Sequence, residues 1–298
     1  MAKNVATASA SAPVVADKKR NQWKEVWRRL KQNKMAMLGL GILVFMVIIA
    51  LSADLLFPKG FDDQMISRRF QLPNSEYWFG TDNLGRGILD RMVHGARVSL
   101  SIGLFAVTIS IVFGGLLGAM AGFYGGKVDN IIMRSLDVLL AIPSILLAIS
   151  IVSALGGGLF NVMLAVGISS IPGYARIVRA SVITLKGQEF IEAARAIGAS
   201  DKRIILRHII PNALAPIIVQ GTLGVAGAIL SAAGLSFIGL GLAPPNPEWG
   251  AMLSGGRQFI RDHWPMTLFP GLAIMITIFA LNLLGDGLRD ALDPKLRN

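Results

Sequence analysis

Five stretches of the chain contain no Asp, Glu, Lys or Arg, and their lengths give the first prediction. The stretches are 35–53, 98–126, 138–175, 209–247 and 263–285. A bilayer core of about 30 Å needs roughly 20 helical residues to cross it. The first, second and fifth stretches therefore each predict one transmembrane helix.

The third and fourth stretches are longer and contain turn-forming residues. Residues 138–175 include three consecutive glycines at 156–158, which predict two spans joined by a tight outer turn. Residues 209–247 end in Pro-Pro-Asn-Pro, which predicts one span followed by a short, partly embedded Gly-rich segment. The pattern as a whole predicts an all-α integral membrane protein with six transmembrane helices. They are expected at about 36–56, 99–122, 131–154, 160–181, 213–235 and 265–285.

Composition and the distribution of charge agree with this architecture. Hydrophobic residues make up 53% of the 298 residues and charged residues only 16%, against about 25% charged in soluble domains. With the N-terminus in the cytoplasm, the cytoplasmic segments hold 21 of the 29 Lys and Arg residues. This bias predicts that both termini are cytoplasmic. It also accounts for the net charge of +11 without a nucleic-acid partner.

The chain divides into five predicted segments. Residues 1–21 are expected to be a disordered cytoplasmic tail. Residues 22–34 place Trp and aliphatic side chains at i, i+3, i+4 and i+7, which predicts an amphipathic helix in contact with membrane lipid; a plain basic anchor is the alternative. Residues 35–57 form the first transmembrane helix and 58–98 an extracytoplasmic segment. Residues 99–298 form a five-helix core.

Two features inside the predicted spans have structural explanations. Gly114, Gly118 and Gly122 form a stripe of small residues that lets helices approach closely, either within the chain or at a subunit interface. Arg134 and Asp137 lie at i and i+3 near the cytoplasmic end of the third span. A local ion pair explains these two residues better than a proton relay.

No catalytic or cofactor-binding arrangement is visible in the sequence. The chain has no cysteine and no G-x-x-x-x-G-K-[ST] phosphate loop. Its three histidines, at 94, 208 and 263, fall on both sides of the predicted membrane and therefore cannot form one metal site. We expect a transport subunit rather than an enzyme, with no metal or cofactor of its own.

A charged, helix-forming segment at 189–212 separates the fourth and fifth predicted spans. Good helix formers lead to Gly198, which suits a left-handed position just after a helix. Ser200 or Asp201 then caps a second helix, and Pro211 ends that helix or opens the fifth span. The predicted helix–turn–helix is either a docking platform for a soluble partner or an ordinary cytoplasmic loop.

The same segment resembles the EAA motif of ABC importer permeases. The match consists of Glu-Ala-Ala at 192–194, Gly198, and Pro211 thirteen positions later. His208 and Ile210 stand where the family pattern has Ile and Leu, which is a mild departure. The motif is specific enough to favour the docking platform over the ordinary loop.

Further passages resemble the peptide-importer branch of that family. They are RHIIPN at 207–212, GTD at 80–82, GARVSL at 95–100, PPNPEWG at 244–250 and GDGLRDALDP at 285–294. The similarity covers about residues 22–298. The chain is thus similar to the C-type permease subunit of a dipeptide or oligopeptide importer.

The resemblance implies the MetI-like permease fold and a multi-pass location in the bacterial inner membrane. It implies four kinds of partner: a second, B-type permease, two ATP-binding subunits that use ATP and Mg, an extracytoplasmic solute-binding protein, and a peptide substrate. The residues that dock the ATPase would be Glu192, Ala193, Ala194, Gly198, Asp201 and Pro211. Two outer residues, Trp249 and Arg257, would contact the solute-binding protein.

Other functions remain as alternatives. Within the family, the cargo could instead be glutathione, a nickel complex or a peptide antibiotic. From a different class, the chain could be a proton-coupled transporter working alone, although no predicted span carries a charge at mid-depth. The sequence does not identify the residues that bind substrate or line a pathway.

Overall fold

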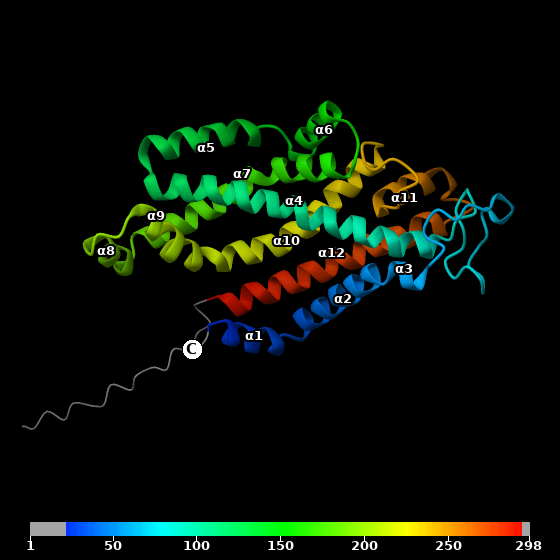
Figure 1. Ribbon diagram of the computed structural model, residues 1–298, viewed down its shortest axis with the longest axis horizontal. Helices are drawn as coiled ribbons and strands as arrows, with labels where there is room; N and C mark the ends of the chain where they lie inside the picture. Colours follow the sequence, from blue (N-terminus) through cyan, green and yellow to red (C-terminus); the bar gives the residue numbers. More distant parts are fainter. Residues whose placement is uncertain (1–21, 294–298) are drawn as a thin grey trace, which may run out of the picture.

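The computed structural model describes residues 22–293 and is helical, with its long helices running along the longest axis of the molecule (Figure 1). Five helices are long and apolar enough to cross a membrane. Four of them contain the whole of a predicted span, and the first covers most of the predicted span 36–56. They are α2 (Lys34–Leu51), α4 (Ile88–Tyr124), α7 (Leu159–Lys186), α10 (Ile210–Phe237) and α12 (Pro265–Leu292).

Shorter helices connect and flank these five. They are α1 (Gln22–Gln32), α3 (Ala53–Leu56), η1 (Ile66–Arg68), α5 (Gly126–Leu140), α6 (Ser144–Leu155), α8 (Glu189–Ala196), α9 (Asp201–Ile204), the π segment η2 (Ile205–Ile209), α11 (Trp249–Gly256) and η3 (Arg257–Phe259). Among residues 22–293 the β-type pairing is a single bridge between Thr81 and Gly87. The predicted tail at 1–21 lies outside the described residues.

The third predicted span, 131–154, is not one straight helix. It consists of α5 and α6, which are bent by 85° at the break between them. Pro143 lies at this break and is the N-cap of α6. Proline has no amide hydrogen to donate and disfavours helical geometry in the residue before it. Counted as one broken span, the pair brings the total to six.

Helix α4 begins at Ile88 rather than near 99, so part of the predicted outer segment is helical. The preceding loop is folded against the same end of the molecule. The ring of Phe70 stacks on His263 with 4.2 Å between ring centroids and also contacts Phe259. The amide of Phe70 donates to the Asp82 carbonyl at 3.1 Å. These contacts fix the outer loop onto η3 and the start of α12.

Helices α4 and α7 pack through the predicted glycine stripe. A β-carbon at Gly114 would lie 2.7 Å from the Ile171 carbonyl oxygen, and one at Gly118 would lie 2.3 Å from that of Ala175. The two backbones are therefore in direct contact, which small residues permit. The stripe serves packing within the chain.

Helix α1 forms where the amphipathic pattern predicts a helix, and it lies beside the C-terminal end of α12 (Figure 1). Leu30 is buried and Val26 partly buried against Ala291 and its neighbours on α12. Trp23 and Trp27 remain 56% and 46% exposed. The predicted apolar stripe is thus divided: its aliphatic members pack on the protein, while its tryptophans face outward.

Candidate functional site

The predicted docking segment lies at one end of the molecule, and the outer loop and α11 lie at the other (Figure 1). Helix α7 runs directly into α8 through Gly187 and Gln188. Helix α9 continues through η2 into α10, and the stretch Asp201–Phe237 passes as one candidate span. The segment is therefore a projection between two long helices.

Gly198 ends α8 in the predicted left-handed conformation, with φ of +80°. The Gly198 amide donates to the Arg195 carbonyl at 2.9 Å, and the Ala199 amide donates to the Ala194 carbonyl at 3.0 Å. These two bonds are the Schellman pattern that closes a helix C-terminus. Ser200 then occupies the N-cap of α9 in extended geometry, without a side-chain hydrogen bond to the helix. The predicted helix–turn–helix is confirmed.

One face of α8 is buried in the protein's own core. Ile191 is fully buried and Ala194 is 6% exposed, in a cluster with Phe123, Val182 and Ile204. The small side chain of Ala194 lets α8 lie close to its own fold, and contact between Ala194 and an ATPase subunit stays a prediction. The sequence did not show which of the two alanines faces inward.

The opposite face of the segment is exposed. Its exposed members among the predicted docking residues are Glu192, Ala193, Gly198, Asp201 and Pro211. Ile197 is 86% exposed and Leu206 54% exposed on the same segment. Sequence reasoning missed these two apolar side chains, although an isoleucine next to a helix-ending glycine was the available signal.

Pro211 lies at the start of α10. This is the second of the two predicted positions, at the opening of the fifth span. A proline at this point removes a helical amide and crowds the carbonyl four residues earlier. The preceding turn widens into the π segment, in which the Ile210 amide bonds to the Ile205 carbonyl. The Asn212 side chain donates to the His208 carbonyl at 2.6 Å. Pro211 also borders a cavity of about 160 Å³ shared with α1 and the end of α12.

The two predicted outer contact residues have different surroundings. Trp249 is only 1% exposed, and its Nε1 donates to the Met92 carbonyl at 3.0 Å. Glu248 holds it in place by accepting the Gly250 and Ala251 amides, both at 2.8 Å. Trp249 thus belongs to the core, and its contact with a binding protein stays a prediction. Arg257 is exposed, with its guanidinium 5.4 Å from the Phe237 ring centroid.

The predicted ion pair between Arg134 and Asp137 does not form. Asp137 instead accepts from Arg176 of α7 at 2.6 Å. Asp129 forms a two-bond pair with Arg179, also of α7, at 2.5 and 2.6 Å. Spacing along one helix did not reveal these partners, because both are on a neighbouring helix. The two pairs hold α5 against α7.

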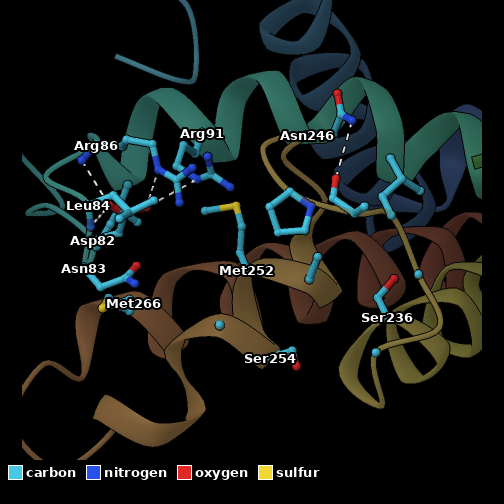
Figure 2. Close-up of a pocket in the computed structure, with 18 of the residues that line it drawn as sticks. Asp82, Asn83, Leu84, Arg86, Arg91, Ser236, Asn246, Met252, Ser254 and Met266 are labelled. Carbon is cyan, nitrogen blue, oxygen red and sulfur yellow. Dashed lines mark hydrogen bonds and ion pairs between the residues drawn. The ribbon is translucent and has the colours of Figure 1, made fainter. Parts of the chain in front are cut away.

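A cavity of about 780 Å³ lies among the segments at the end of the molecule opposite α8 (Figure 1), and Figure 2 shows residues that line it. Four separate parts of the chain line it: the loop and first turn of α4, the glycine turn at 157–158, the loop after α10, and the α11–η3 segment with the start of α12. Its charged members are Asp82, Arg86 and Arg91. No local pattern in the sequence indicated that these segments meet.

Comparisons with known proteins agree with the resemblance. Residues 114–298 match the family of binding-protein-dependent transport system inner membrane components, and residues 21–73 match the N-terminal transmembrane domain of oligopeptide transport permease C. The dipeptide transport system permease protein DppC of Alkalihalophilus pseudofirmus is 51% identical over 93% of this chain and 91% of its own. The glutathione transport system permease protein GsiD of Pectobacterium atrosepticum is 46% identical over 97% of both chains.

The fold has a solved counterpart. A chain of the MetNI methionine ABC transporter in an inward-facing conformation aligns with a TM-score of 0.55 and 19% identity, over 68% of this chain and 96% of that one. At this identity the likeness concerns the fold alone, and that fold is the MetI-like permease fold. The protein is a multi-pass component of the bacterial inner membrane. It belongs to the inner-membrane permease family of ABC importers and, within that family, to the C-type subunits of dipeptide and oligopeptide importers.

Proposed function

We propose that this chain is the transmembrane permease subunit of an ATP-driven, binding-protein-dependent importer of dipeptides or oligopeptides. It pairs with a second permease to form the translocation pathway, and two ATP-binding subunits that use ATP and Mg drive the pair. An extracytoplasmic solute-binding protein delivers the peptide. The chain itself moves its cargo without changing it chemically. The observation that carries the proposal is the similarity to dipeptide and di/tripeptide permeases over nearly the whole chain.

The α8–α9 segment is the proposed contact with an ATP-binding subunit. Its exposed face carries two carboxylates, Glu192 and Asp201, and an apolar surface made by Ala193, Ile197 and Leu206. Its inner face is fixed to the fold through Ile191. A segment held in this way moves with α7 and α10 rather than independently of them.

This connection supplies a mechanism for coupling. When the ATPase dimer closes on ATP, the groove around α8–α9 moves and carries the ends of α7 and α10 with it. Because α7 lies in direct backbone contact with α4, the displacement reaches the rest of the bundle. The pathway then changes between inward and outward access by movement of packed elements. In this arrangement both termini and the α8–α9 end face the cytoplasm.

Purification of the tagged chain from its native host in mild detergent tests the assembly. We expect a second permease and two P-loop ATPases to co-purify, and the reconstituted complex to accumulate a dipeptide when ATP and the binding protein are supplied. Recovery of the chain alone, with uptake that survives ATP depletion and stops with the proton gradient, would instead support a self-sufficient transporter.

Glutathione is a second candidate cargo, because permeases named for glutathione transport are 46–47% identical to this chain. A competition experiment distinguishes the two candidate cargoes. Uptake of a labelled dipeptide that is blocked by excess unlabelled dipeptides but not by glutathione supports the dipeptide assignment, and the reverse pattern supports glutathione.

A further inference from the structure

We call the cavity of about 780 Å³ at the end opposite α8 the outer cavity. Its wall contains more buried positive charge than buried negative charge. The side chains of Arg86 and Arg91 are each 8% exposed, and that of Asp82 is 9% exposed. A further carboxylate, Asp62, approaches Arg86 to 3.0 Å, but it is 37% exposed and does not line the cavity. Two buried guanidinium groups therefore share one buried carboxylate.

The two arginines do not share that carboxylate equally. Arg86 donates from Nε to Asp82 at 2.8 Å and from Nη1 to Asp62 at 3.0 Å, so two carboxylates satisfy it. Arg91 reaches Asp82 only at 3.7 Å, beyond hydrogen-bond distance. The Nη1 of Arg91 donates to the carbonyls of Phe61 and Pro245, both at 3.2 Å.

Arg91 thus has donors left over. Within residues 22–293, neither its Nε nor its Nη2 donates a hydrogen bond. A guanidinium has five N–H groups in a planar fork that matches a carboxylate. Arg91 and Met252 both line the cavity, and Figure 2 labels both. An anion in the cavity can accept hydrogen bonds from the Nε–H and Nη2–H groups of Arg91.

The rest of the cavity suits a neutral, partly apolar body. Among its lining residues Asp82 is the sole acidic one, and the apolar surface comes from side chains such as Leu84, Leu242 and Met266. Uncharged amides are supplied by Asn83, Asn246 and Gln258. On the wall formed by the end of α10, the Ser236 hydroxyl is buried and has no hydrogen-bond partner within the described chain. The volume of about 780 Å³ lies within the range of roughly 300–1,000 Å³ typical of small-molecule sites.

We propose that this cavity is an acceptor site for a small peptide, whose C-terminal carboxylate is bound by Arg91. This inference rests on the proposed function for the choice of a peptide as ligand. The amide-bearing lining side chains can pair with the peptide bond of such a ligand, and the apolar lining residues can accommodate its side chains. The site favours a free carboxylate, because a carboxylate brings a negative charge and two acceptor oxygens to the Arg91 fork, whereas a C-terminal amide has one acceptor oxygen, no charge, and an NH2 group that cannot accept.

The size of this preference follows from the hydrogen bonds involved. Bonds to a charged group contribute about 1.5–3 kcal/mol each, so loss of one such bond lowers affinity by roughly tenfold or more. A peptide amide keeps the body of the ligand and removes only the charged end. The ratio of acid to amide affinity therefore reports on Arg91 and not on the general fit of the cavity.

The test uses the full chain with its co-purifying partners in lipid nanodiscs, without binding protein or nucleotide. The probes are dialanine and dialanine amide, and binding of each is measured by saturation-transfer NMR titration. We expect the acid to bind at least about tenfold more tightly than the amide. Arg91→Gln should reduce acid binding to the level of the amide, and Arg91→Lys should keep part of the preference. Arg69→Gln, an exposed arginine of the same outer loop that does not line the cavity, should keep all of it.

Several results would overturn the proposal. Equal binding of acid and amide to the native protein, or no binding of either, removes the acceptor site without recourse to any variant. A preference that persists in Arg91→Gln assigns the carboxylate to another residue. Peptide uptake with ATP and binding protein is measured in parallel. If uptake proceeds while the cavity shows no preference, the importer assignment stands and the acceptor site fails.

Discussion

The turn between α8 and α9 depends on one backbone conformation, and substitutions at Gly198 isolate its contribution. The residue has φ of +80°, and a β-carbon built there would have no atom within 4 Å. A side chain at this position therefore meets no steric conflict within the chain, and the cost is that of the backbone alone. For a residue with a β-carbon, a left-handed conformation costs about 1–2 kcal/mol.

This cost predicts a graded series. Gly198→Asn should be tolerated best because Asn adopts the left-handed region more readily than other residues, Gly198→Ala should lose about 1–2 kcal/mol, and Gly198→Val should lose more because its side chain is β-branched. A loss of about 1.4 kcal/mol raises the population of the opened turn tenfold. If α8–α9 must keep its shape to transmit movement, peptide uptake per ATP hydrolysed should fall in the same order.

The assay combines two measurements on each variant. Hydrogen–deuterium exchange reports on the Gly198 and Ala199 amides, which bond to the Arg195 and Ala194 carbonyls in the native turn. Uptake and ATP hydrolysis are measured in proteoliposomes. Exchange and uptake in Gly198→Val equal to those of the native protein would refute the reasoning. Loss of uptake in Gly198→Asn with unchanged exchange would show that added bulk, rather than backbone conformation, is what matters.

Four further predictions follow from the packing and the outer loop. Gly118→Ala places a β-carbon 2.3 Å from the Ala175 carbonyl oxygen and should destabilise the protein by about 1–3 kcal/mol in thermal unfolding. The control is Gly115→Ala, whose β-carbon would have no atom within 4 Å. This control should leave the melting temperature unchanged or raise it. Glu248→Ala removes the acceptor of two amides at 2.8 Å and should cost about 1–3 kcal/mol, a value that a melting temperature like that of the native protein would contradict. A double-mutant cycle on Asp129 and Arg179, which are 20% and 34% exposed, should give a coupling of only about 0.2–1 kcal/mol, and a coupling several times larger would mean that the pair is shielded from water. The hydrogen bond from Gln64, and then that from Arg86, hold the pKa of the Asp62 carboxyl below its ordinary value of 3.8. The stability that Asp62 contributes is therefore present above about pH 4 and lost as the pH falls further. The melting temperature of Asp62→Asn should depend less on pH below about pH 4 than that of the native protein, and the same pH dependence in both would contradict the assignment.

The apolar pattern was sufficient to locate the spanning helices, because membrane-spanning length and freedom from charge are properties of consecutive residues. The turn at Gly198 was predictable for the same reason: a helix followed by glycine is a local signal. The glycine stripe on α4 indicated close packing but not the partner, which is the α7 backbone near Ala175.

The failures concern relations between distant residues. The spacing of Arg134 and Asp137 suggested a pair, but Arg176 lies closer to the carboxylate in space. Trp249 was expected at the outer surface, whereas it is buried next to the helix cap that Glu248 forms. The outer cavity joins four parts of the chain, and no local pattern predicts such a meeting. Pro143 is a local signal for the bend between α5 and α6. The length of the apolar stretch alone did not reveal that bend.

Site-directed cross-linking at position 193 tests the central claim most directly. The chain has no cysteine, so Ala193→Cys provides a unique thiol on this chain for a photoactivatable cross-linker, at an exposed position of α8. Ser75→Cys, in the exposed outer loop at the opposite end, is the matched control. The account predicts a product with an ATP-binding subunit from position 193 and none from position 75. The absence of that product from 193 in an assembled, ATP-hydrolysing complex, or its formation from 75, would contradict the account.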